Sequence, residues 1–130
     1  MINKSDILNG AKQCKEITVE ALNNETIFIR KLNDGEIAEI TSIIVSGGKM
    51  VNNDGEMEVQ ISGEEAIKNT KRAKHVAIAY SLTNKENPDK WKPSEIAQLT
   101  SDVVQELGKK VAEYSGMLNT KTFRNWGEDG

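Results

Sequence analysis

The stretch from Glu64 to Asn84 constrains the fold of this chain most strongly, because its character changes half-way along. At about 100° per residue, its first half has a mixed apolar side and a basic side. Its second half, Val76 to Leu82, is apolar on nearly every side. A helix that begins at the surface and then becomes apolar all round enters the interior of a small domain. We therefore expect the other segments to pack around residues 76–82, whose amides should exchange most slowly.

The composition narrows the class of protein. A length of 130 residues suits one domain, and a net charge of −3 with interspersed signs argues against binding nucleic acid through bulk electrostatics. Cys14 is the only cysteine, so no internal disulfide can form. The sequence shows neither a signal-peptide core nor the roughly 20 consecutive apolar residues that a bilayer requires. These features predict a cytosolic protein without a membrane or nucleic-acid partner.

The N-terminal third has the period of a β-hairpin. A period of two runs through residues 17–22 and 27–30, and the Asn23-Asn24 pair between them tolerates the positive φ of a tight turn. Because an isolated hairpin is marginally stable in water, its Ile/Val face must pack on helices. The expected fold class is α+β and mostly helical, with an N-terminal β-hairpin packed on a bundle of three to four helices.

Helices are predicted from the 3.6-residue period and from end signals over residues 34–46, 64–84, 93–99 and 101–115. Asp34 is the expected N-cap of the first helix, and Gly116 the C-cap of the last. The inner sides of these helices supply the predicted core: Ile37, Ile40, Ile44, Val76, Ala77, Ile78, Tyr80, Leu82, Leu99, Val103, Val104, Leu107 and Val111.

The domain is expected to span residues 1–118. Within it, residues 49–63 are either a loop or a short second hairpin about Asn53-Asp54-Gly55, inserted between helices. Residues 119–130 are predicted to be a flexible C-terminal tail.

No combination of residues predicts catalysis. His75 is the only histidine, which rules out a multi-histidine metal site. It lies on the basic side of the predicted central helix, where an ordinary surface or partly buried histidine is a better interpretation than a catalytic one. Residues 46–49 lack the spacing and the preceding strand of a phosphate-binding loop, and residues 50–61 lack carboxylates at the first and last positions of a calcium loop. We therefore expect no enzyme activity, no cofactor and no metal.

A basic stripe lies on one side of the predicted central helix: Lys68, Lys71, Arg72 and His75. These side chains can contact phosphates or an acidic partner. Glu64 and Glu65 precede them by one turn, so local pairing on a solvated helix face explains the stripe equally simply and is the favoured interpretation.

The order of the segments resembles the tail assembly chaperones of long-tailed bacteriophages. The first matching piece is the alternating strand pair that ends at Arg30 and leads through Leu32 to Glu36 in a helix. The second runs from an alanine-rich helix to its closing turn and matches at Ser81, Leu82, Thr83, Asn84, Trp91, Pro93, Glu95, Ile96, Leu99, Ser115, Gly116 and Met117. Together the pieces span most of residues 6–118. The chain departs from the family at the Leu22-Asn23-Asn24 turn, at the insertion 49–63 and in its short tail.

The resemblance implies a function without catalysis. Such proteins bind the tape measure protein, a very long helical protein, and keep it soluble while tail-tube subunits polymerise around it. They act in the host cell cytoplasm during assembly and are absent from the mature virion. In many of these phages a frameshifted extension recruits tail-tube protein. We also expect weak self-association along the client.

The candidate partner contacts come from the residues themselves. Four apolar side chains near the polar C-terminus have no evident place in the predicted core: Met117, Leu118, Phe123 and Trp126. They either contact the client or, for Phe123 and Trp126, fold back onto the domain. Two other functions stay open: a structural minor tail or connector protein of the virion, and a small nucleic-acid-binding regulator that uses the basic stripe.

Overall fold

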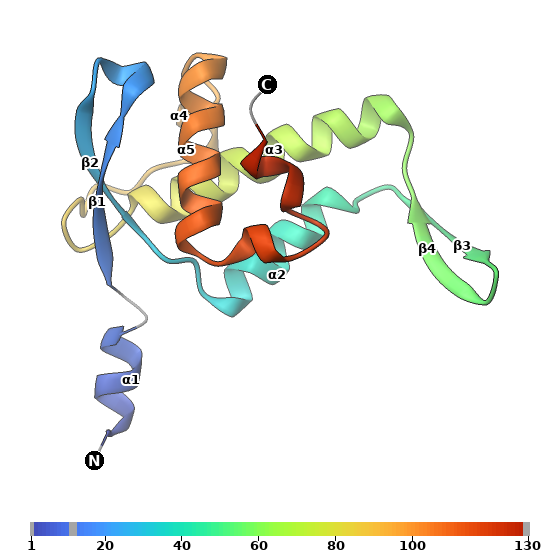
Figure 1. The fold of residues 1–130 in the computed structure, drawn as a ribbon, viewed down its shortest axis with the longest axis horizontal. Helices are drawn as coiled ribbons and strands as arrows, with labels where there is room; N and C mark the ends of the chain where they lie inside the picture. Colours follow the sequence, from blue (N-terminus) through green and yellow to red (C-terminus); the bar gives the residue numbers. More distant parts are fainter. Residues whose placement is uncertain (1, 11–12, 129–130) are drawn as a thin grey trace.

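The computed structural model describes residues 2–10 and 13–128, and it has the expected α+β architecture. Figure 1 shows a body from which two segments project at opposite ends. One consists of residues 2–10, here called the N-terminal arm, and contains helix α1 (Lys4–Gly10). The other is the hairpin of β3 (Lys49–Asn53) and β4 (Glu56–Gln60), here called the hairpin arm, residues 49–60.

The predicted N-terminal hairpin is confirmed. Strands β1 (Cys14–Val19) and β2 (Glu25–Arg30) pair antiparallel, and the short helix η1 (Glu20–Leu22) lies between them. The first strand therefore begins and ends three residues earlier than expected, and residues 20–22 of the predicted strand form a 3-10 helix instead. Asn23 and Asn24 adopt φ values of 56° and 60°, a region that asparagine tolerates better than most residues. The inward side chains of the hairpin belong to the core and pack against the helices: Ile17, Val19 and Ile29.

Helix α3 (Gly63–Leu82) is the centre of the body, as the apolar run at residues 76–82 predicts. Helix α2 (Asp34–Ile44), the short α4 (Pro93–Ile96) and α5 (Ser101–Tyr114) all pack on it (Figure 1). Three alanines on α3, at 73, 77 and 79, are buried, and their small side chains let the neighbouring helices approach closely. The N-cap of α2 is Asn33 rather than the expected Asp34, because Asn33 and Glu36 form a reciprocal capping box.

Most of the predicted core is fully buried, and all of it packs together. Seven of its members are buried: Ile40, Ala77, Ile78, Leu82, Val103, Leu107 and Val111. The other six are partly buried against this cluster: Ile37, Ile44, Val76, Tyr80, Leu99 and Val104. The core also includes hairpin residues and, less expectedly, Met117, Phe123 and Trp126 near the C-terminus.

The C-terminal segment is folded onto the body, which corrects the prediction of a flexible tail for the residues up to 128. Two 3-10 helices, η2 (Met117–Asn119) and η3 (Arg124–Gly127), bring Phe123 and Trp126 together edge to face with ring centroids 5.1 Å apart. Both rings are buried, since the large apolar surface of an aromatic side chain favours packing. The last two residues of the predicted tail lie outside the described residues.

The uncertain segment 49–63 contains the second hairpin. Asp54 and Gly55 have φ values of 54° and 86°, as in a two-residue type I′ turn. Met50 pairs with Val59 and Asn52 with Met57, so the three apolar side chains share one face of the ribbon. Gly48 precedes this arm, and a Cβ atom there would lie 2.3 Å from Val59 Cγ1, which explains the glycine.

Candidate partner-binding groove

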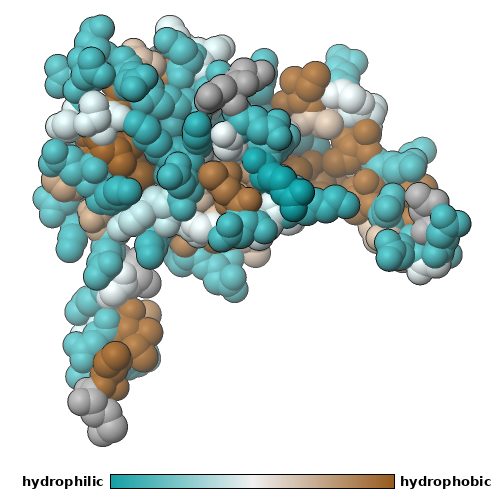
Figure 2. All heavy atoms as spheres, in the orientation of Figure 1, coloured by the Kyte–Doolittle hydropathy of each residue, from teal (hydrophilic) through white to brown (hydrophobic). Residues whose placement is uncertain are grey.

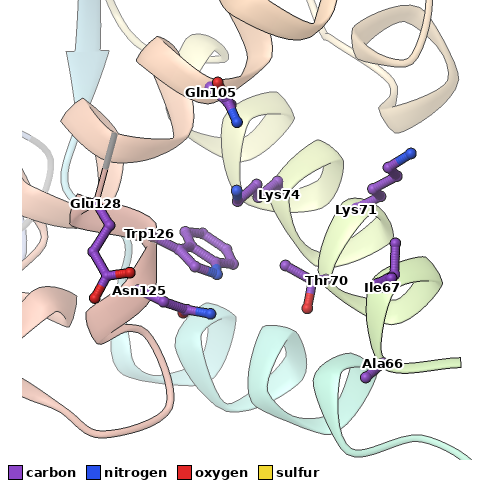
Figure 3. A pocket seen from close by; sticks show the side chains of 9 residues that line it. All are labelled: Ala66, Ile67, Thr70, Lys71, Lys74, Gln105, Asn125, Trp126 and Glu128. Carbon is purple, nitrogen blue, oxygen red and sulfur yellow. The ribbon is translucent and has the colours of Figure 1, made fainter. Parts of the chain in front are cut away.

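A groove separates the first half of α3 from the C-terminal segment. It has a volume of about 580 Å³, and Figure 3 shows the side chains that line it: Ala66, Ile67, Thr70, Lys71, Lys74, Gln105, Asn125, Trp126 and Glu128. In Figure 3 the Trp126 indole faces the α3 side chains across the groove, and Glu128 and Asn125 lie on its own side. The groove therefore joins segments that are far apart in the sequence.

The exposed apolar residue of the groove is Ile67. It lies on the apolar side of α3, yet 63% of its surface is exposed. Gly108 of α5 packs against the Lys74 side chain, and α3 extends from that point toward its N-terminus away from the body (Figure 1). The helical period indicates correctly which side of α3 is apolar, but that side is fully covered only farther along the helix.

Trp126 forms the inner wall of the groove. Its ring is held edge-on by Phe123, and Lys74 Nζ lies 5.7 Å from its centroid, within the range of a cation–π contact. Burial lowers the pKa of the Lys74 ammonium, which is consistent with a lysine whose stem lies along apolar surface. The wall is thus apolar with a cation at its edge.

The charge of the groove is mixed, with the cations on the α3 side. Lys71 and Lys74 come from α3, and Glu128 is the carboxylate among the lining residues. His75 is half-buried nearby, and burial together with the charge of Lys71 lowers its pKa. An acidic side chain at the α3 edge of a bound partner would therefore meet two lysines.

The structure brings only part of each predicted set to this groove. From the basic stripe, Lys71 lines it, whereas Lys68 and Arg72 are exposed elsewhere on α3. No ion pair of the described residues joins the stripe to Glu64 or Glu65. The stripe is a solvated face, but without the local pairing that its spacing suggests.

The predicted partner contacts need a correction, because most of them are buried. Met117 and Phe123 are each 2% exposed, so neither offers a contact surface in this conformation. Leu118 is half-buried beside Gly127, and Trp126 reaches the groove only as its wall. Sequence reasoning missed Ile67 and Lys74. A lysine at an apolar-side position of α3 was the available signal that this side is incompletely covered.

The first residues that carry the family resemblance form a structural network. Arg30 donates to both carboxylate oxygens of Glu36, at 2.8 and 2.7 Å, and its Nε donates to the Thr83 carbonyl at 3.0 Å. Ser81 Oγ accepts from Arg30 N at 3.1 Å and donates to Arg30 O at 2.7 Å. The pair with Glu36 raises the pKa of Arg30. Burial acts to raise the pKa of Glu36, but the bonds from Arg30 and Asn33 outweigh it and lower that pKa. The network fastens β2 to the end of α3.

Asn84, Leu32 and Ser115, which also belong to the two pieces of sequence, make further long-range hydrogen bonds. Asn84 Nδ2 donates to the carbonyls of Phe28 and Ser81, at 3.0 and 2.9 Å, and its Oδ1 accepts from the backbone of residues 86 and 87. Leu32 N donates to Ser115 Oγ at 3.0 Å. The two pieces of sequence on which the expected family pattern was based therefore contact each other in space, as parts of the framework rather than of the groove.

Two further findings bear on function. Among residues 2–10 and 13–128, no group of three or more histidine, cysteine, aspartate or glutamate side chains is placed to hold a metal ion. Within the same described residues, no helix combines the length and hydropathy needed to cross a membrane.

Comparison with family models, curated proteins and solved structures gives no match in any of the three.

Proposed function

We propose that this protein is a tail assembly chaperone of a long-tailed phage, which binds helical segments of the tape measure protein and keeps them soluble before the tail tube forms. The observation that carries the proposal is the groove beside Ile67 and Trp126, with Lys71 and Lys74 at its α3 edge. The resemblance in segment order supplies the identity of the client. The protein acts without catalysis.

The groove suits an amphipathic helix. Apolar anchors spaced at three and four residues can lie over Ile67, while carboxylates of the same helix approach the two lysines. Trp126, which is only 3% exposed, supports the groove from its inner side. A hollow of about 580 Å³ receives a few side chains rather than a whole helix. Each contact is therefore weak, and a long client with many such stripes gains its affinity from repeated sites. Weak single sites also let the chaperone leave as tube subunits arrive.

The test is co-expression with a tape measure fragment from the same genome. We expect the fragment to remain soluble with the wild-type protein, and to precipitate with the variants Ile67→Asp and Lys71→Glu. Lys121→Glu is the matched control, because it makes the same charge change at an exposed position outside the lining of the groove. Circular dichroism checks that all variants fold.

Equal precipitation of the fragment with and without the protein would contradict the proposal. Full retention of solubility by Ile67→Asp and Lys71→Glu would contradict the assignment of the groove. Detection of the chain in purified virions would favour the structural tail protein instead. A reading frame for a very long helical protein beside this gene, after a slippery site, would support the chaperone and its tail-tube-recruiting extension.

A further inference from the structure

The groove continues into a second hollow on the outer face of α5, here called the acidic hollow. It has a volume of about 570 Å³ and shares Gln105 and Glu128 with the groove. Two lysines line it beside five carboxylates, which leaves an excess of three negative charges: Glu20, Asp102, Glu106, Glu113 and Glu128. Glu106 is already occupied, because it accepts two backbone hydrogen bonds and pairs with Lys110 at 3.0 Å. The other four carboxylates are exposed.

A third hollow follows between α5 and β1, here called the Tyr114 hollow. It has a volume of about 490 Å³ and shares Lys110 and Glu113 with the acidic hollow. Two lysines of the N-terminal hairpin reach the tyrosine ring in it. Lys15 Nζ lies 5.7 Å and Lys31 Nζ 5.4 Å from the ring centroid, so both make cation–π contacts with the same side chain.

These two lysines lack an ion-pair partner. No ion pair within residues 2–10 and 13–128 involves Lys15 or Lys31. Glu16 also lines the hollow, but the alternation of side chains along β1 places it on the other face of the hairpin, where it pairs with Phe28. Two ammonium groups that converge on one ring repel each other. A carboxylate that enters the Tyr114 hollow relieves this repulsion and is therefore favoured there.

The three hollows form one band across α5, and their charges alternate. The groove has Lys71 and Lys74, the acidic hollow has its excess of carboxylates, and the Tyr114 hollow has its two unpaired lysines. Helix α5 contacts both α3 and β1, and Figure 1 shows it between the N-terminal hairpin and the first half of α3. Figure 2 shows a largely hydrophilic surface over α5. The order along the band is positive, negative, positive.

This order of charge indicates the chemistry of a partner. A nucleic-acid backbone is uniformly negative and would be repelled by the acidic hollow at the centre of the band. A protein segment ordered acidic, basic, acidic instead meets an opposite charge in every hollow. A helix of about 20 residues is about 30 Å long, which is the diameter of a small domain, so a single helix can cross the band.

We propose that the band selects client helices whose charges are ordered acidic, basic, acidic along their length. The inference rests on the proposed function, which supplies a long helical client, and it adds the property by which segments of that client are recognised. The apolar stripe of the same helix lies toward Ile67, at the groove end of the band. A segment of another charge order places like charges together in at least one hollow, and this repulsion rejects it.

The test compares labelled helical peptides of about 21 residues, in three blocks of about seven residues or two turns each. All carry leucines at three- and four-residue spacing. The first has the block order acidic, basic, acidic, and the second has the same residues in the order acidic, acidic, basic. Fluorescence anisotropy with the full chain measures each Kd. We expect the wild type to bind the first peptide with a Kd about fivefold lower, because several weak exposed charge pairs act together.

A charge swap in the Tyr114 hollow should change this preference. The double variant Lys15→Glu with Lys31→Glu makes the hollow negative, so it should lose the preference for the first peptide and bind best a third one, ordered acidic, basic, basic. Lys4→Glu with Lys121→Glu is the matched control, because it makes the same change in net charge at exposed positions outside the three hollows. The control should keep the wild-type order of affinities. Circular dichroism checks that both variants fold.

Equal affinity of the wild type for the first two peptides would overturn the inference, as would a lack of measurable binding to either. An unchanged preference in the Lys15→Glu, Lys31→Glu variant would overturn it too. Tighter binding of a duplex oligonucleotide than of any peptide would overturn it and favour the nucleic-acid regulator. The two proposals fail separately. A tape measure fragment that precipitates in co-expression contradicts the proposed function, whereas equal peptide affinities beside a soluble fragment contradict only the charge order.

Discussion

The body and the two arms are held in their conformations by different kinds of interaction. In the body, several hydrogen bonds join distant residues, 51 positions apart between Arg30 and Ser81 and 86 positions apart between Glu20 and Glu106. In the arms, side chains bond three positions away, as between Asn3 and Asp6 or between Gly55 and Asn52. The body therefore gains stability from packing, whereas the arms have local signals without a packed face.

The largest effect should follow from opening a cavity in the body. Ile78 is fully buried on α3, so Ile78→Ala should lower the free energy of unfolding by about 2–5 kcal/mol. The corresponding truncation in the hairpin arm, Met57→Ala, should cost less than about 0.5 kcal/mol, because that side chain is 60% exposed. Urea unfolding followed by circular dichroism measures both. Similar losses in the two variants would show that the arm is part of the cooperative unit.

The next effect concerns the hydrogen bonds that Asn84 makes between β2 and the end of α3. Asn84→Ala removes the amide that satisfies the carbonyls of Phe28 and Ser81, of which the bond to Ser81 is buried and the bond to Phe28 partly buried. We expect a loss of about 3 kcal/mol in the free energy of unfolding, since unsatisfied buried groups are costly. Asn119→Ala, at an exposed position, is the control and should have little effect. A stable Asn84→Ala variant would mean that water replaces the amide.

A smaller effect should depend on pH. The pKa of Glu36 is lowered in the folded protein below its ordinary value of 4.5, so the folded state binds fewer protons than the unfolded state. The stabilisation from this group is complete above pH 4.5 and is lost as the pH falls through the lowered pKa. Glu36→Gln should cost about 2 kcal/mol at pH 7. It should cost less at pH 3, because the wild type has by then already lost part of the stabilisation that the ionised carboxylate gives. Unfolding curves at the two pH values, with Glu113→Gln as control, give the result. An equal loss of unfolding free energy in Glu36→Gln at pH 7 and at pH 3 would contradict this prediction.

The smallest free energies should belong to the arms. Amides of residues 76–82 should exchange only through global unfolding, whereas those of α1 and of residues 49–60 should open at about 0–2 kcal/mol. Hydrogen exchange followed by mass spectrometry resolves the segments. Fast exchange at Val76–Leu82 would mean that the core is misplaced.

The sequence predicts the body well because its segments carry strong periods. The change from amphipathic to apolar character at Val76 places α3, and the period of two in residues 17–22 places the hairpin. The burial of Phe123 and Trp126 was one of two open alternatives, because a short non-repeating segment has no period to indicate a direction. Polar neighbours in the sequence say little about which surface lies beneath an aromatic ring.

The groove is harder to predict than the core for a related reason. A helical period assigns Ile67 and Ala73 to the same side of α3 but does not show where α5 stops covering that side. The contact between Trp126 and Lys74 joins residues from two segments whose relative position only the packed structure defines. The sequence therefore supplied single members of the groove, Lys71 and Trp126, without supplying the groove.

The long-range bonds of the N-terminal hairpin have a consequence for synthesis. Glu20 and Ala21 donate to Glu106, and Leu32 donates to Ser115, across 86, 85 and 83 positions. During translation the hairpin leaves the ribosome long before α5 exists, so its Ile/Val face has no surface on which to pack. The nascent chain must therefore remain open until residues 106 and 115 have been made. Closure of the body consequently waits for α5, although the hairpin that these bonds fasten is made about 80 residues earlier.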